Sequence, residues 1–121
     1  MPGRGIMSAD ERRRAPRVPY MVSIYELKRL HVEGTVRDLS ETGFGVRGIK
    51  ATVGEVKSFI IPVEEVVDID ALIFAGTCRW ASPDVDGQWL TGFELTKISE
   101  ENLRHLRRLI RFLSEDDKGQ R

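Results

Sequence analysis

The stretch HVEGTVRDLSETGFGVRG, residues 31–48, is the part of the chain that decides its fold. Residues 31–39 alternate between apolar and polar side chains as a strand does, and residues 43–48 predict a second strand. Between them, DLSETG (38–43) combines a carboxylate, hydroxyls and a glycine, which is the composition of a tight turn. The stretch therefore predicts two strands joined by a polar turn.

Four more segments have the length and the β-branched or aromatic content of strands, and glycine, proline and acidic residues separate them. They are VPYMVSIY (18–25), EVKSFIIPV (55–63), DALIFAGTCRWA (70–81) and QWLTGFELT (88–96). Six short strands at this spacing, without an internal repeat, predict a mainly β protein, either an antiparallel barrel or a sandwich.

The hydrophobic period then changes to that of a helix over residues 99–113. Ser99 can cap the first turn, and the acidic residues that follow it suit the positive end of the helix. One face carries Leu103, Leu106, Ile110 and Leu113, and the other sides carry Arg104, Arg107, Arg108 and Arg111. We expect this amphipathic helix to cover an open end or face of the β-structure, or to form an interface, with the arginines in solvent.

Composition limits the class of protein. The 121 residues suffice for one domain, and 19 basic residues balance 19 acidic ones, so an anion site has to be local. The single cysteine, Cys78, fits a buried position in a reducing compartment. The apolar runs are too short to span a membrane, and no signal-peptide pattern opens the chain. We expect a soluble, cytoplasmic protein with a flexible arm (1–11), one domain (12–113) and a flexible tail (114–121).

A second motif lies ahead of the first strand. RRRAPR, residues 12–17, places four arginines in six positions around a proline. In an antiparallel hairpin whose turn is centred near Lys28, Val18 lies opposite Asp38, so RRRAPR and DLSETG meet at one rim.

The groups that meet there suit a guanine nucleotide. Guanidinium groups hold phosphate and also pair with guanine O6 and N7 or stack on its face. Asp38 and Ser40 supply an acceptor and a hydroxyl for guanine N1 and N2 or for an arginine. Gly43 and Gly45 permit approaches that a β-carbon would block.

These residues resemble a known family. Arg13-x-x-x-Arg17 followed by Asp38-x-Ser40-x-x-Gly43 is similar to the paired motif of PilZ domains, the bacterial receptors for cyclic di-GMP (c-di-GMP). GTCRW (76–80), GFEL (92–95) and the terminal helix follow the order and spacing of the family, so that the resemblance covers about residues 11–113.

The resemblance implies a six-stranded antiparallel β-barrel, with a C-terminal helix, that binds c-di-GMP without any catalysis or cofactor. Arg13 and Arg17 would contact guanine and phosphate, and Asp38, Ser40 and Gly43 would line the opposite side. An arginine at position 12 accompanies an intercalated ligand dimer in this family. Arg12 therefore joins the expected site, and we expect binding to order the N-terminal arm as the signal in motility or biofilm regulation.

Other functions remain open from the sequence. A PilZ-like adaptor would bind a protein partner and no nucleotide. An enzyme is disfavoured because His31 and His105 have no nucleophile or metal-ligand spacing near them, and the acidic residues of segment 64–70 read as a solvated loop. The aromatic residues Trp80, Trp89 and Phe93 are expected in the core rather than on a base-stacking platform. We expect no binding to nucleic acid or membrane, an unidentified protein partner, and a monomer or weak homodimer.

Overall fold

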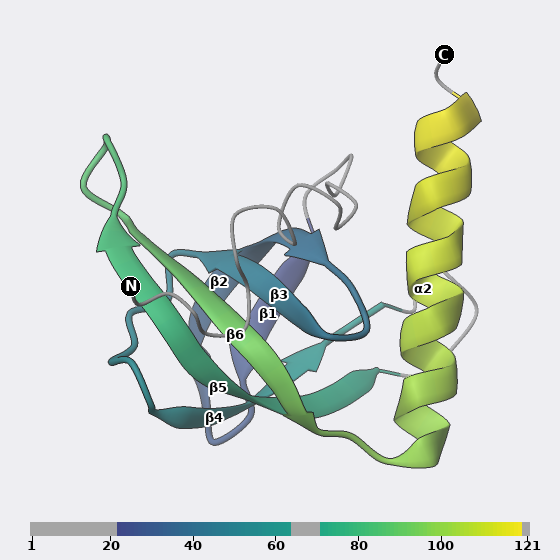
Figure 1. The fold of residues 1–121 in the computed structure, drawn as a ribbon, viewed down its shortest axis with the longest axis horizontal. Coiled ribbons are helices and arrows are strands. Elements are labelled where there is room, and N and C mark those ends of the chain that lie inside the picture. Colours follow the sequence, from purple (N-terminus) through teal and green to yellow (C-terminus); the bar gives the residue numbers. More distant parts are fainter. Residues whose placement is uncertain (1–21, 64–70, 120–121) are drawn as a thin grey trace.

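The computed structural model describes residues 22–63 and 71–119, with side chains up to residue 114. These residues form six strands and a helix (Figure 1). The elements are β1 (Ser23–Glu26), β2 (Arg29–Leu39), β3 (Gly43–Arg47), β4 (Val56–Ile61), β5 (Leu72–Pro83), β6 (Trp89–Lys97) and α2 (Glu100–Gly119).

The strands close into one barrel in the order β1-β2-β3-β6-β5-β4, and every neighbouring pair is antiparallel. The structure therefore selects the barrel over the sandwich and confirms the predicted six-stranded fold. Closure removes the unpaired strand edges that an open sheet would expose. The β5–β6 hairpin is the longest, and its tip projects beyond the body of the barrel (Figure 1).

Four phenylalanines fill the barrel. The ring of Phe44 stacks on Phe93, with centroids 5.3 Å apart and planes 11° from parallel. It meets Phe59 and Phe74 edge-on at centroid distances of 5.5 and 4.9 Å. Because such rings bury large apolar areas in preferred stacked and edge-to-face geometries, they fix β3, β4, β5 and β6 around one centre. Cys78 is fully buried in the same core, as predicted.

Helix α2 stands beside the barrel and completes this core (Figure 1). Ser99 caps it as predicted, because its Oγ accepts a hydrogen bond from the amide of Asn102 at 3.0 Å. The Asn102 side-chain oxygen accepts from the amide of Ile73 at the start of β5, at 2.9 Å, so the first turn is also attached to the barrel. Three leucines of the helix are fully buried: Leu106, Leu109 and Leu113.

Several boundaries differ from the prediction. The first hairpin turns at Leu27 and Lys28 alone, whereas the sequence suggested a connection over residues 26–30, because exposed residues at a strand end carry no alternating pattern. The helix continues to Gly119, so residues 114–119 belong to it rather than to a tail. Its apolar period ends at Leu113, and the polar turns beyond give no signal of burial.

Candidate functional site

A row of residues crosses four neighbouring strands on the outer face of the barrel. Asp38 of β2 pairs with Gly45 of β3, Gly45 pairs with Gly92 of β6, and Gly92 pairs with Trp80 of β5. The two end members, Asp38 and Trp80, are the candidate ligand-binding side chains, and the two glycines lie between them. We call Asp38, Gly45, Gly92 and Trp80 the outer row.

Two β-bulges turn Asp38 and Trp80 outward. The register shifts between Val36 and Asp38 on β2, and again between Cys78 and Trp80 on β5. Val36 and Cys78 both lie in the core, so without the extra residue in each strand the side chains two positions later would also point inward. The bulges therefore place a carboxylate and an indole on the outside of the barrel.

Gly45 makes room for the Asp38 carboxylate. A β-carbon at position 45 would lie 2.9 Å from both carboxylate oxygens of Asp38, closer than real contacts allow. The carboxylate therefore lies across the backbone of β3, and only 6% of the Asp38 surface is exposed. The contact fixes the direction of the strongest acceptor in the row, whereas the approach of a ligand to Gly45 that the sequence suggests stays a prediction.

Gly92 does the same for Trp80. A β-carbon at position 92 would overlap the indole nitrogen of Trp80, so the indole lies against the backbone of β6. Trp80 is half-buried. The expectation that Trp80 belongs to the core is therefore wrong, whereas Phe93 is fully buried as expected. The sequence places a tryptophan and a glycine on two consecutive predicted strands. It does not predict that they pair, because the pairing depends on a bulge that has no local sequence signal.

The DLSETG turn closes upon itself. The Ser40 amide donates to the Gly43 carbonyl at 2.9 Å, and the Ser40 Oγ accepts from the amides of Thr42 and Gly43 at 3.2 and 3.3 Å. The Thr42 carbonyl in turn accepts from the amide of Leu95 on β6 at 2.9 Å. Ser40 therefore shapes the turn with its hydroxyl, and its predicted contact with a ligand is a second use of that group.

An ion pair lies beside the row. Gly43 pairs with Glu94 of β6, whose carboxylate accepts from Nη2 of Arg79 at 2.6 Å and from its Nε at 3.1 Å. About a third of each side chain is exposed. Arg79 is the extra residue of the β5 bulge and precedes Trp80, so the bulge also brings a guanidinium to the edge of the row.

The predicted site is therefore assembled in part. Asp38 lies in the outer row, and Ser40 and Gly43 lie in the turn at its edge. Arg12, Arg13 and Arg17 lie outside the described residues, as do Val18 and segment 64–70, so the meeting of the two motifs stays a prediction. His31 is exposed, whereas His105 is half-buried.

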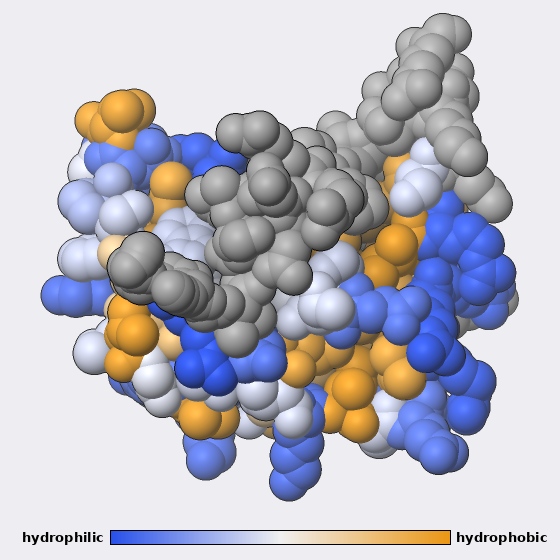
Figure 2. Space-filling model, viewed as in Figure 1, coloured by the Kyte–Doolittle hydropathy of each residue, from blue (hydrophilic) through white to orange (hydrophobic). Residues whose placement is uncertain are grey.

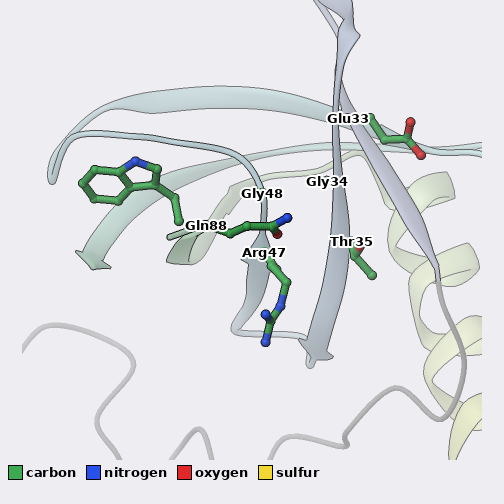
Figure 3. A pocket seen from close by; sticks show the side chains of 7 residues that line it. Glu33, Gly34, Thr35, Arg47, Gly48 and Gln88 are labelled. Carbon is green, nitrogen blue, oxygen red and sulfur yellow. The ribbon is translucent and has the colours of Figure 1, made fainter. Parts of the chain in front are cut away.

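A surface hollow of about 420 Å³ opens elsewhere, where β2, the end of β3 and the start of β6 meet (Figure 3). The side chains of Glu33, Thr35 and Arg47 point in different directions rather than toward one centre (Figure 3). The Arg47 guanidinium is already held by Asp84 at 2.5 Å. The outer row, in which a carboxylate and an indole lie on one face of the barrel, is therefore the better candidate. The lining residues are Glu33, Gly34, Thr35, Arg47, Gly48, Gln88 and Trp89.

Comparison with known proteins identifies the family. A model of the PilZ domain matches residues 11–112, so the chain belongs to the PilZ domain family. No curated protein matches the sequence. Within the described residues, no helix is long and apolar enough to cross a membrane.

Solved structures share the fold. The inhibitor of motility MotI/DgrA of Bacillus subtilis superposes with a TM-score of 0.68 at 16% identity, over 91% of this chain and 53% of that one. The PilZ domain of Escherichia coli YcgR, solved with c-di-GMP, gives 0.63 at 17% identity, over 88% and 90%. The longer YcgR of the same organism, also in complex with c-di-GMP, gives 0.68 at 16%, over 91% and 49%. The chain thus spans about half the length of MotI and of the longer YcgR.

The contact between Asp38 and Gly45 yields a prediction about stability. Gly45→Ala should lower the free energy of unfolding by about 1–3 kcal/mol, because the added methyl overlaps both carboxylate oxygens. In the Asp38→Ala background, the same change should be neutral or stabilising, because it then only reduces the freedom of the unfolded chain. Urea denaturation of the four proteins measures this cycle. An equal cost in both backgrounds would show that another contact explains the glycine.

Proposed function

We propose that this protein is a non-catalytic receptor for c-di-GMP. The observation that carries the proposal is the outer row, in which a carboxylate and an indole lie against two backbone glycines on one face of the barrel. The chain belongs to the PilZ family, and a structural neighbour, the YcgR PilZ domain, was solved with c-di-GMP.

The groups of the outer row suit one half of the ligand. The Asp38 carboxylate can accept from the N1 and N2 donors of a guanine edge. The indole of Trp80 offers an apolar face, on which a base stacks at a gain of about 1–3 kcal/mol. The glycines let both side chains lie close to the strand backbone, so in the proposal a base meets the carboxylate and the indole rather than the backbone.

The phosphates require cations, which the N-terminal motif supplies in the proposal. Arg13 and Arg17 bind guanine and phosphate from the side opposite Asp38, Ser40 and Gly43, and Arg12 serves a second, intercalated ligand molecule. A local clamp of this kind is compatible with a chain whose net charge is zero.

All the groups assigned to the site hold a ligand rather than transform it. The one thiol of the chain, Cys78, lies in the core, where burial raises its pKa and keeps it protonated. The site thus offers acceptors, donors and stacking surfaces for recognition. Catalysis has no part in the proposal.

The first test is a calorimetric titration of the purified protein. We expect saturable binding of c-di-GMP and much weaker binding of GTP and GMP, because the site holds a compact ligand with two bases and two phosphates. Equal affinity for the linear nucleotides would contradict the proposed ligand. Absence of binding at low-micromolar protein would favour the adaptor that binds no nucleotide.

The second test addresses single arginines. Arg13→Ala or Arg17→Ala should weaken binding about tenfold or more, because each charge-assisted hydrogen bond contributes about 1.5–3 kcal/mol. Arg14→Ala is the matched control, since it removes the same charge from the same tract but lies outside the motif. Melting curves should coincide for all variants. If Arg14→Ala weakened binding as much as Arg17→Ala, the tract would act only through its total charge.

The third test concerns the signal. Residues 1–17 have few apolar side chains, so in the free protein little offsets the cost of ordering, about 1–2 kcal/mol per residue. Amide hydrogen exchange should therefore slow in residues 10–18 and 38–45 when c-di-GMP is added, with little change in residues 100–113. Protection of residues 10–18 that is equal with and without ligand would exclude ordering as the signal, even where calorimetry confirms binding.

A further inference from the structure

Four arginines form a stripe on the exposed side of α2. Arg104, Arg107, Arg108 and Arg111 recur at the helical spacing of three and four residues, and all four are exposed. We call them the α2 arginine stripe. In Figure 2, hydrophilic residues follow the outer edge of α2, on the side away from the barrel. The opposite side of the helix carries the buried leucines, so the stripe cannot turn inward.

The stripe has few internal counter-charges. Arg107 donates from Nε to the Glu41 carboxylate of the DLSETG turn at 3.1 Å, and both side chains are about half exposed. Among the residues whose side chains the structure describes, no carboxylate lies within salt-bridge distance of Arg104, Arg108 or Arg111. Like charges three and four residues apart destabilise a helix, so the free protein tolerates a repulsion that an added anion would relieve.

We propose that the α2 arginine stripe docks a short acidic segment of a partner protein. Along the axis, Arg104 and Arg108 are about 6 Å apart and Arg108 and Arg111 about 4.5 Å apart, because a helix rises about 1.5 Å per residue. Glutamates four and three residues apart on a partner helix have the same spacings, so each can meet one arginine. The contact with Glu41 shows that a carboxylate already satisfies one member of the stripe.

The surroundings of the stripe favour a protein segment over a nucleic acid. In the sequence, Glu100 and Glu101 precede the stripe and SEDD (114–117) follows it, so acidic residues flank the four arginines on both sides. A long polyanion that extends beyond the stripe would meet this negative charge, and the chain has no net positive charge to hold it. A segment that presents two or three carboxylates would fit between these ends.

The test uses the full chain without c-di-GMP, so its result does not depend on the proposed nucleotide site. The probe is a fluorescent alanine-based peptide of about 16 residues with glutamates alternately four and three residues apart, long enough to form helix. Fluorescence anisotropy at low salt should show saturable binding that weakens as salt is added. The triple variant Arg104→Gln, Arg108→Gln, Arg111→Gln should bind about tenfold more weakly, since each exposed pair contributes a small share.

The control variant is Lys28→Gln, Arg29→Gln, Lys97→Gln, which removes the same charge from exposed positions in the β1–β2 turn and on strands β2 and β6, and should change affinity less than about twofold. Glutamine retains helix propensity, and the single variant Arg108→Gln tests the same surface with less perturbation if the triple variant melts early. Absence of peptide binding, or an equal loss in the control variant, would overturn the proposal. Tighter stripe-dependent binding of a short DNA duplex would also overturn it.

Discussion

The candidate site depends on one constraint, the extra residue that each of β2 and β5 carries at its bulge. A strand presents alternate residues to opposite faces, so the strand segments that follow Val36 and Cys78 would present Asp38 and Trp80 to the core. An unpaired carboxylate among phenylalanines would cost several kcal/mol, and the barrel would not form in that register. The bulges resolve this conflict, and the same shift that protects the core creates a polar face outside it.

The core gives that face its rigidity. Phe44 and Phe93 stack inside the barrel. Phe44 comes directly before Gly45, and Phe93 directly after Gly92, so each ring is next to a glycine of the outer row. The inner side of this part of the sheet is therefore closely packed, while on its outer side the two glycines leave room for the Asp38 carboxylate and the Trp80 indole. Because backbone held by buried aromatic residues moves little, the carboxylate of Asp38 and the indole of Trp80 keep a fixed separation. A ligand that matches this separation loses no free energy in rearranging the strands.

The sequence predicts most of the fold and names some residues of the candidate site, for identifiable reasons. Strand number, the capping Ser99 and the buried Cys78 follow from local patterns, and the motif marks Asp38, Ser40 and Gly43. Trp80 was misplaced because the face that a residue occupies depends on register, and a bulge changes register without a local signal. Helix α2 extends beyond its predicted end at Leu113. Hydrophobic periodicity marks only the helical turns that are buried, and the polar turns after Leu113 have no such periodicity.

The turn and the helix are joined by the pair between Glu41 and Arg107, which sets an upper limit on communication between the two proposed surfaces. An ion pair that is half exposed at both ends contributes about 0.2–1 kcal/mol, so even its complete loss changes an affinity by at most about fivefold. Nucleotide at the outer row and a partner on the α2 arginine stripe would therefore bind almost independently through this route. A strong signal between the two surfaces therefore requires a structural change with a larger free energy. Ordering a segment of many residues is such a change, because fixing the backbone of each residue costs more free energy than this ion pair contributes.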